Sequence, residues 1–289
     1  MKKCIFLILI IITTLTTFAQ EVKESTTVVN NMNQPCISAD YALSGEIIEG
    51  AFIKKMADAK ISKASKATNG FKLYKGVTVS EITKETIDLY FKVEDKKTSA
   101  ILTMALSKGY DNFLKKETDS VSIENAKIYL TKFVNDATAF LLAKQMNEQA
   151  AVVKSLEKKL KGQSKDEEGY TKDKSKIESK INSNKIDIVA LKIEMEAQQK
   201  ALETVKMKTV TVEEMNALKK ELSKQQSTTE KATKKYNNAL EDAGTYNENL
   251  KKAEDKIMDA VLEQTKTKSE ITEANKKIDD LKTQLANLK

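Results

Sequence analysis

Residues 246–288 read YNENLKKAEDKIMDAVLEQTKTKSEITEANKKIDDLKTQLANL, without a proline and without a long apolar run. Steps of alternately four and three residues through this segment, continued back to residue 218, reach only uncharged side chains, although charged residues are frequent between them. Such a repeat of 3.5 residues is typical of a helix that buries one stripe against another helix. The sequence therefore predicts a coiled coil, with a seam formed by Leu218, Leu222, Gln225, Thr229, Ala232, Tyr236, Ala239, Ala243, Tyr246, Leu250, Ala253, Ile257, Ala260, Gln264, Thr267, Ile271, Ala274, Ile278, Leu281, Leu285 and Leu288.

A second seam runs through the preceding part of the chain. Between its two halves, residues 162–174 include Gly162 and Gly169 and place Glu167 and Lys174 at seam positions. Because these seam positions would bury little apolar area, we expect residues 162–174 to be loosened or looped out of the coiled coil. The second seam consists of Leu142, Met146, Gln149, Val153, Leu156 and Leu160, followed by Ile177, Ile181, Asn184, Ile188, Leu191, Met195, Gln198, Leu202 and Val205.

The frame of the two seams slips by one residue within the segment 209–212, which reads TVTV. β-branched residues disfavour helix, and Thr211 with Glu214 matches the capping box that begins a new helix. We therefore predict a turn near 207–211 that folds residues 142–289 into an antiparallel hairpin and returns residues 281–288 toward Phe133. The alternative is one much longer helix that contains a stammer and dimerises in parallel, with Asn184 setting the register.

Residues 41–141 predict a small α+β domain in which helices cover an antiparallel sheet. A helix is expected at 44–59, although Gly45 and Gly50 weaken its pattern. Strand-like segments follow at 71–79, 87–93 and 100–106, and we expect them to form an antiparallel meander. The first helix and a second one cover one face of this sheet. The second helix contributes Ile123, Leu130, Phe133, Val134, Ala137 and Phe140.

The N-terminus reads as a secretory signal peptide over residues 1–19. Lys2 and Lys3 precede an apolar core, and cleavage is expected after Ala19. No later segment approaches the roughly 20 apolar residues that a transmembrane helix needs. Residues 20–40 are polar, lack a sustained period and predict a disordered leader. We therefore expect an exported protein that resides in the periplasm, with the cell surface and the medium as alternative locations. All basic residues are lysines, a bias typical of a Bacteroidota-like source.

Once the signal is removed, Cys36 is the remaining thiol of the chain. A single cysteine cannot form an internal disulfide, whatever the compartment. We expect an idle thiol within the flexible leader. An intermolecular disulfide is the alternative.

The composition argues against catalysis. Histidine is absent, which removes the usual acid–base group at neutral pH and the commonest zinc ligand. The glycines form neither a P-loop nor a dinucleotide-binding fingerprint. A Ser-x-x-Lys pattern at 155–158 lies on the outside of the predicted coiled coil, where no pocket would lower the pKa of the lysine. The sequence predicts a protein that is not an enzyme and that has no metal and no cofactor.

Two surfaces of the α+β domain are candidates for binding. The aromatic loop Tyr110, Asp111, Asn112 and Phe113 either docks a partner or closes the sheet as a packed turn. The other is a basic segment that either contacts an anionic glycan or lipid surface or forms a solvated face. Nucleic-acid binding is disfavoured because arginine is absent and the expected compartment is wrong. The lysines of the basic segment are Lys54, Lys55, Lys60, Lys63, Lys66, Lys72 and Lys75.

These patterns favour an exported, non-catalytic scaffold or interaction protein of the bacterial envelope. Its coiled coil would provide reach and self-association, and its α+β domain would dock, so that its partners are further copies of itself or an envelope protein. In its signal peptide, excess lysine, small β-containing body and helical arms the chain resembles the Skp family, which implies a periplasmic holdase chaperone as an alternative. A binder of anionic envelope polymers is the third hypothesis.

Overall fold

The computed structural model describes residues 21–61, 63–96, 98–109, 112–208, 211 and 214–288. They form two compact units. Unit 1 comprises the residues up to Gln149 and those from Lys277 onward, and unit 2 comprises Ala150–Lys276. The elements are β1 (Val22–Val29), β2 (Met32–Tyr41), α1 (Gly45–Asp58), β3 (Ser65–Lys66), the short 3-10 helix η1 (Thr68–Gly70), β4 (Lys72–Val77), β5 (Ile87–Asp95), β6 (Ala100–Ser107), α2 (Lys116–Lys206) and α3 (Met215–Ala286).

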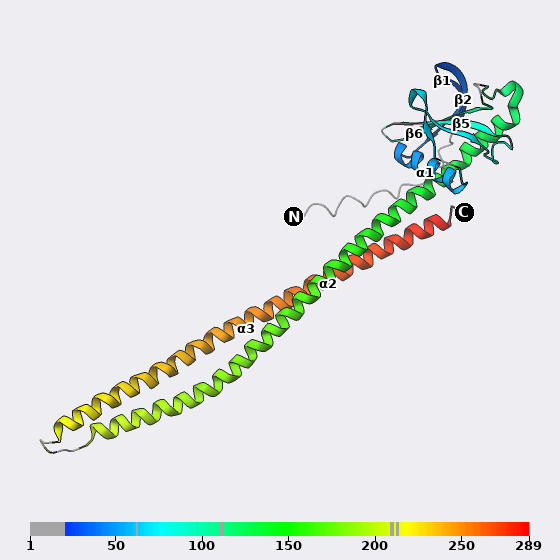
Figure 1. Ribbon diagram of the computed structural model, residues 1–289. Coiled ribbons are helices and arrows are strands. Elements are labelled where there is room, and N and C mark those ends of the chain that lie inside the picture. Colours follow the sequence, from blue (N-terminus) through cyan, green and yellow to red (C-terminus); the bar gives the residue numbers. More distant parts are fainter. Residues whose placement is uncertain are drawn as a thin grey trace. The chain divides into compact units, whose positions relative to one another are not determined.

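Unit 1 contains a six-stranded antiparallel sheet in the order β1-β2-β6-β5-β4-β3 (Figure 1). The three predicted strands correspond to β4, β5 and β6, and the pairing of Phe91 with Met104 belongs to the predicted meander. The fold class is thus confirmed as an α+β domain followed by a helical hairpin.

One face of the sheet is covered by α1 and the first turns of α2. Phe52 of α1 packs on Phe91 of β5, with ring centroids 4.7 Å apart, and on Phe133 of α2 at 5.7 Å. The Tyr41 hydroxyl donates a hydrogen bond of 2.8 Å to the Leu130 carbonyl and so joins β2 to α2. Of the residues expected to cover the sheet, Val134 is not buried, because its side chain lies at the flank of the covered face and is 37% exposed.

The disordered leader predicted for residues 20–40 is wrong. Residues 22–41 instead form the hairpin β1–β2, which adds two strands to the sheet. Its two-residue turn, Asn30-Asn31, has positive φ at both positions, as a type I′ turn requires. Pro35 is tolerated because β2 pairs with β6 only from Ile37 onward, so no β6 partner needs its missing N–H.

Cys36 consequently does not lie in a flexible leader. Its side chain is 5% exposed and joins a small cluster on the other face of the sheet, with Tyr90 and Phe113. The Cys36 Sγ lies 3.0 Å from the Ser25 hydroxyl. Burial raises the pKa of the Cys36 thiol, and hydrogen bonds from Ser25 and Ser38 only partly oppose this. A thiol in this position is poorly placed for an intermolecular disulfide.

Helix α1 confirms the helix expected at 44–59, and close packing explains why two of its positions are glycine. A Cβ on Gly45 would lie 2.9 Å from the Asp95 Cβ, and the Asp95 carboxylate accepts a 2.7 Å hydrogen bond from the Gly45 amide. Asp95, at the end of β5, therefore caps the α1 N-terminus. A Cβ on Gly50 would lie 2.8 Å from the Phe140 ring, so this glycine lets α1 approach α2 closely.

Unit 2 consists of the antiparallel pair of α2 and α3. The predicted seam residues of α3, and those of α2 from Val153 to Val205, are buried or half-buried. Polar seam residues connect the helices, since the Gln225 amide donates to the Gln198 side chain at 2.8 Å. The hairpin is therefore confirmed over the single long helix. The residues from Lys277 onward belong to the same compact unit as the sheet, as the predicted return of the chain requires.

The loosened segment predicted at 162–174 is wrong, because α2 is continuous there. Its polar seam residues find partners on α3: the Gln264 amide donates to Glu167 at 2.6 Å, and Lys174 forms an ion pair of 3.0 Å with Glu254. Gly162 is an exposed position with open space around it and does not interrupt the helix.

The turn between the helices lies where the sequence predicted it, and of its residues 209–214 the structure describes Thr211 and Glu214. The Thr211 amide and hydroxyl both donate to the Glu214 carboxylate, at 3.1 and 3.0 Å. The bond from the Thr211 amide is the glutamate half of the predicted capping box. Both bonds hold the pKa of Glu214 below its ordinary value.

We predict opposite effects for two substitutions of glycine by alanine within helices. Gly50→Ala should lower the free energy of unfolding by about 1–3 kcal/mol, because the added methyl overpacks against Phe140. Gly162→Ala should raise it by about 0.5–1 kcal/mol, because alanine favours helix and the site is open. Urea denaturation of the full chain measures both. Equal effects of the two variants would contradict the close approach of α1 to α2.

Candidate functional site

A concavity of unit 1 with a volume of about 620 Å³ lies between α1, the β4–β5 connection and α2. Met56, Ile61 and Phe140 contribute to its apolar lining. Charged side chains from all three segments surround them. We call this concavity the cleft, and its charged residues are Lys54, Lys55, Asp58, Glu81 and Asp136.

Lys55 is the central charged group of the cleft. Its ammonium lies 2.9 Å from the Asp136 carboxylate, 3.4 Å from Glu81 and 5.0 Å from the centre of the Tyr129 ring. Burial lowers the pKa of Lys55, but the hydrogen bond and charge of Asp136, together with Glu81, outweigh burial and raise the pKa overall. Lys55 therefore stays a cation. Its contacts join α1, the β4–β5 connection and α2, which are far apart in the sequence.

The structure does not gather the seven lysines of the basic segment into one patch. Lys54 pairs with Asp58 at 2.9 Å, and Lys72 pairs with Glu49 of α1 beside the helix-covered face of the sheet. Lys75 lies one position after the buried Tyr74, on the opposite face of β4. Lys66 is the register partner of Lys72, while Lys60 and Lys63 lie exposed in the connection between α1 and β3. Only Lys54 and Lys55 line the cleft.

The aromatic loop after β6 is, in its described part, a packed turn. The Lys108 amide donates to the Asn112 carbonyl at 2.9 Å, and the Asn112 amide to the Gly109 carbonyl at 3.0 Å. Phe113 is 3% exposed and packs on Tyr90, so it does not present an anchor to a partner. Asn112 is exposed, whereas Tyr110 and Asp111 lie outside the described residues.

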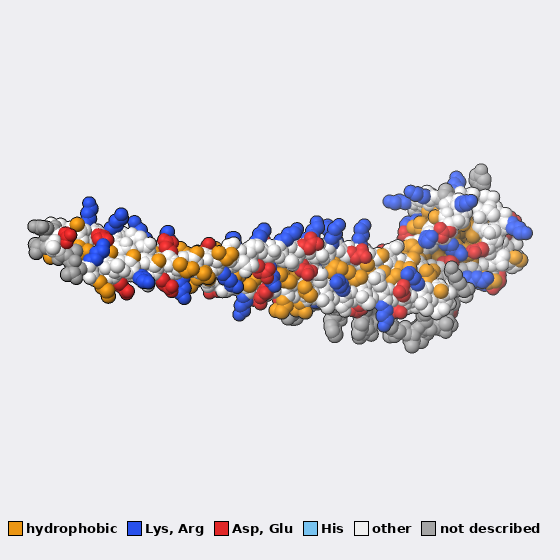
Figure 2. Space-filling model, turned by 90° about the horizontal axis from the view of Figure 1, so that it is seen from below, with side chains coloured by type: hydrophobic (Ala, Val, Ile, Leu, Met, Phe, Trp, Pro, Cys, Tyr) orange, Lys and Arg blue, Asp and Glu red, His pale blue; other side chains and the backbone are white. Residues whose placement is uncertain are grey.

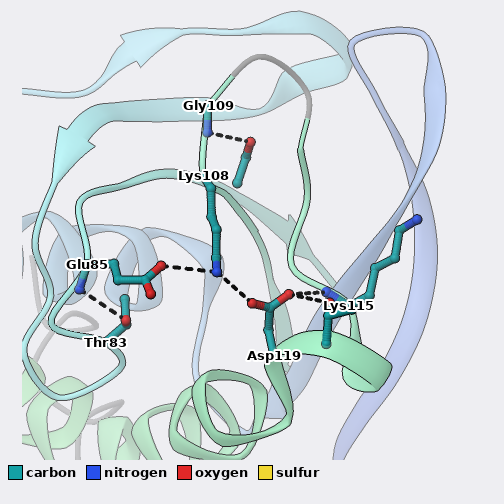
Figure 3. A network of polar contacts seen from close by, with 8 residues as sticks. Thr83, Glu85, Lys108, Gly109, Lys115 and Asp119 are labelled. Atoms are coloured by element: carbon teal, nitrogen blue, oxygen red, sulfur yellow. Dashed lines mark hydrogen bonds and ion pairs between the residues drawn. The ribbon is translucent and has the colours of Figure 1, made fainter.

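An ion-pair network fixes this loop to the start of α2 (Figure 3). Lys108 lies 2.9 Å from Asp119 and 3.1 Å from Glu85, and Asp119 also accepts bonds from the Thr118 hydroxyl and the Lys115 amide. The hydrogen bond from Lys108 is the largest of the effects that lower the pKa of Asp119. Asp119 is also the one α2 residue with non-helical backbone angles, so its side chain caps a kinked first turn.

The surface of unit 2 offers a second candidate site. Three large apolar side chains of α2 lie outside the seam and in solvent: Ile186 is 71% exposed, Val189 60% and Ile193 63%. On α3, Met258, Val261 and Leu262 are also exposed. In Figure 2, lysines and acidic side chains are mixed along these helices. The spacing of Ile186, Val189 and Ile193 by three and four residues is visible in the sequence, on a side of α2 outside the predicted seam.

Within the described residues, no group of three or more cysteine and acidic side chains could hold a metal ion. No described helix combines the length and the apolarity that crossing a membrane requires. The candidate sites are therefore two surfaces, the cleft of unit 1 and the exposed apolar side chains of unit 2.

Comparisons with known proteins give no family. No family model matches the sequence, and no curated protein matches it. Among solved structures, CalU16 from Micromonospora echinospora is similar over 39% of this chain and 97% of that chain, with 7% identical residues and a TM-score of 0.20. At that TM-score the likeness carries no argument about fold or function.

We predict a pH-dependent contribution of Asp119 to stability. Asp119→Asn should lower the melting temperature of the full chain at pH 7 by about 2–4 °C. A carboxylate whose pKa is lowered stabilises the fold above its ordinary pKa of 3.8, and this stabilisation is lost as the pH falls through its lowered folded-state pKa. The difference between variant and wild type should therefore vanish in acid. Glu117→Gln, an exposed neighbour, is the control and should change little; equal shifts would contradict the network.

Proposed function

We propose that this chain is an exported, non-catalytic interaction protein of the bacterial envelope, in which the paired helices self-associate and the α+β domain docks a partner. The observation that carries the proposal is the exposure of Ile186, Val189 and Ile193 on the outer side of α2. Large apolar side chains in a row on a helix surface mark an interaction site, because their exposure to water is unfavourable.

The composition of the seam supports self-association. The buried seam residues of α3 are alanines, threonines and a glutamine, whereas its leucines and isoleucines remain half-buried. Small side chains bring two helices close but remove little apolar area from water. A pair of helices of this kind gains stability when further helices cover its sides, as in larger bundles.

The cleft supports docking by the α+β domain. It combines an apolar lining with charged groups at its edge, the usual make-up of a recognition site. An anionic-polymer binder is less well supported, because the lysines of the basic segment divide between the two faces of the sheet and three of them pair with acids. The absence of histidine from the sequence favours a role without catalysis.

Self-association is tested by sedimentation velocity of the full chain over about a hundredfold range of concentration, which spans about 2.7 kcal/mol of association free energy. The sedimentation coefficient should rise with concentration. A coefficient that stays at the monomer value would overturn this part of the proposal.

The same material should then be added to an unfolded outer-membrane protein at equal molar ratio, with light scattering as the readout. We expect aggregation to proceed unhindered, because the proposed apolar surface serves specific pairing. Full suppression would favour the holdase alternative instead.

Docking by the cleft is tested with a photo-crosslinking amino acid at Lys54, whose side chain is exposed at the cleft edge. In cells that express the chain, a discrete crosslinked product should form from position 54. The same amino acid at the exposed Lys231 of α3 is the control and should not give that product. Identical products from both positions would contradict docking by the cleft.

A further inference from the structure

We propose that a second copy of this chain packs in parallel against one face of α2, which we call the outer stripe. The outer stripe consists of Ile186, Val189, Ala190, Ile193 and Ala197, all exposed and none of them in the seam. The inference rests on the self-association proposed above and names its surface and its partner.

The helical repeat places the outer stripe on one face. Residues at spacings of three, four and seven lie above one another on a helix of 3.6 residues per turn, so positions 186, 189, 190, 193 and 197 share a side. Asn182 and Lys200 occupy the same side and end the stripe at either end. The stripe is therefore about three turns long, with its largest side chains, Ile186 and Ile193, two turns apart.

The charges that flank the outer stripe differ in sign between its two sides. Lys185 and Lys192 lie along one side, and Asp187 and Glu194 along the other, each about a quarter turn or slightly more from the stripe. Glu196 also lies on the lysine side, 3.9 Å from Lys192, and leaves that side with a net positive charge. The helix thus presents an apolar strip between a positive and a negative edge.

This charge arrangement favours a second copy in parallel orientation. When two identical helices pair in parallel about a twofold axis, the positive edge of each meets the negative edge of the other. In an antiparallel pair, each edge meets its own counterpart and like charges face each other. The outer stripe is therefore complementary to itself in one orientation only.

The exposed apolar group of α3 is a weaker partner for the outer stripe. Met258, Val261 and Leu262 cover little more than one turn, and Asp255 and Lys266 interrupt their side of the helix. A contact between this group and the outer stripe would also be heterologous, and heterologous contacts build rings or open chains of molecules instead of a twofold pair. Leu262 is consequently a suitable control position.

The surface is tested by sedimentation equilibrium of the full chain and two variants. Ile193→Glu places a charge in the middle of the outer stripe and should weaken dimerisation at least about tenfold. Leu262→Glu adds the same charge at a similarly exposed apolar site of α3 and should leave dimerisation unchanged. Circular dichroism should show that both variants keep their helix content, since neither position is buried.

The orientation is tested by disulfide trapping in a Cys36→Ala background. Ile186→Cys should form a disulfide between two copies, because equal positions adjoin in a parallel pair. In an antiparallel pair centred between Val189 and Ala190, position 186 faces position 193. An equal mixture of Ile186→Cys and Ile193→Cys chains would then crosslink while Ile186→Cys alone would not, and this result overturns the parallel arrangement.

The outcomes separate the two proposals. If the full chain dimerises and Leu262→Glu weakens the dimer while Ile193→Glu does not, the outer stripe is the wrong surface and the proposed self-association stands. If the full chain remains a monomer at all concentrations, both fail together.

Discussion

Helix α2 must bury one face against the sheet and, further along the same helix, one face against α3. On the face toward the sheet, Leu130 and Phe133 are fully buried in the core of unit 1. On the face toward α3, the seam residues from Val153 to Val205 are buried or half-buried. The residues at these buried and half-buried positions are therefore limited in kind along much of the 91-residue helix.

The composition of the unit 2 seam also affects where the larger apolar side chains of this unit lie. Its buried positions hold small or polar side chains such as Ala239, Thr267 and Gln264, so that the helices lie close without burying much apolar area. Larger apolar residues are found on the outside, among charges of both signs. A two-helix unit of this composition differs from a coiled coil filled with leucine, which satisfies its apolar residues within the pair.

Periodic patterns predicted much of this fold. The seam was visible because it avoids charge over many turns, and β5 was visible because its apolar and polar residues alternate. The strands β1 and β2 were missed because β1 is an exposed edge strand, with few buried residues to give it a period. The pair Asn30-Asn31 beside β-branched residues was a hairpin signal in the sequence. The cleft was beyond prediction, since Lys55, Glu81 and Asp136 meet only in the folded chain. The lysine segment left two interpretations open, and the spatial division of its lysines depends partly on the strands, where neighbours point to opposite faces.

The polar residues of the seam have a consequence for how the hairpin closes. Glu167 faces Gln264, and Gln198 faces Gln225 and Thr229 about 46 Å away along α2. A slide of α3 by one heptad would preserve the stripe of uncharged residues but would place Glu167 beside Ile257 or Ile271. The same slide would place Gln198 against leucines or against Ala232 and Tyr236. Each of these misplacements would leave a polar group in an apolar setting without a hydrogen-bond partner. The heptad repeat by itself permits many alignments of α2 and α3, and these few polar residues restrict the helices to one of them.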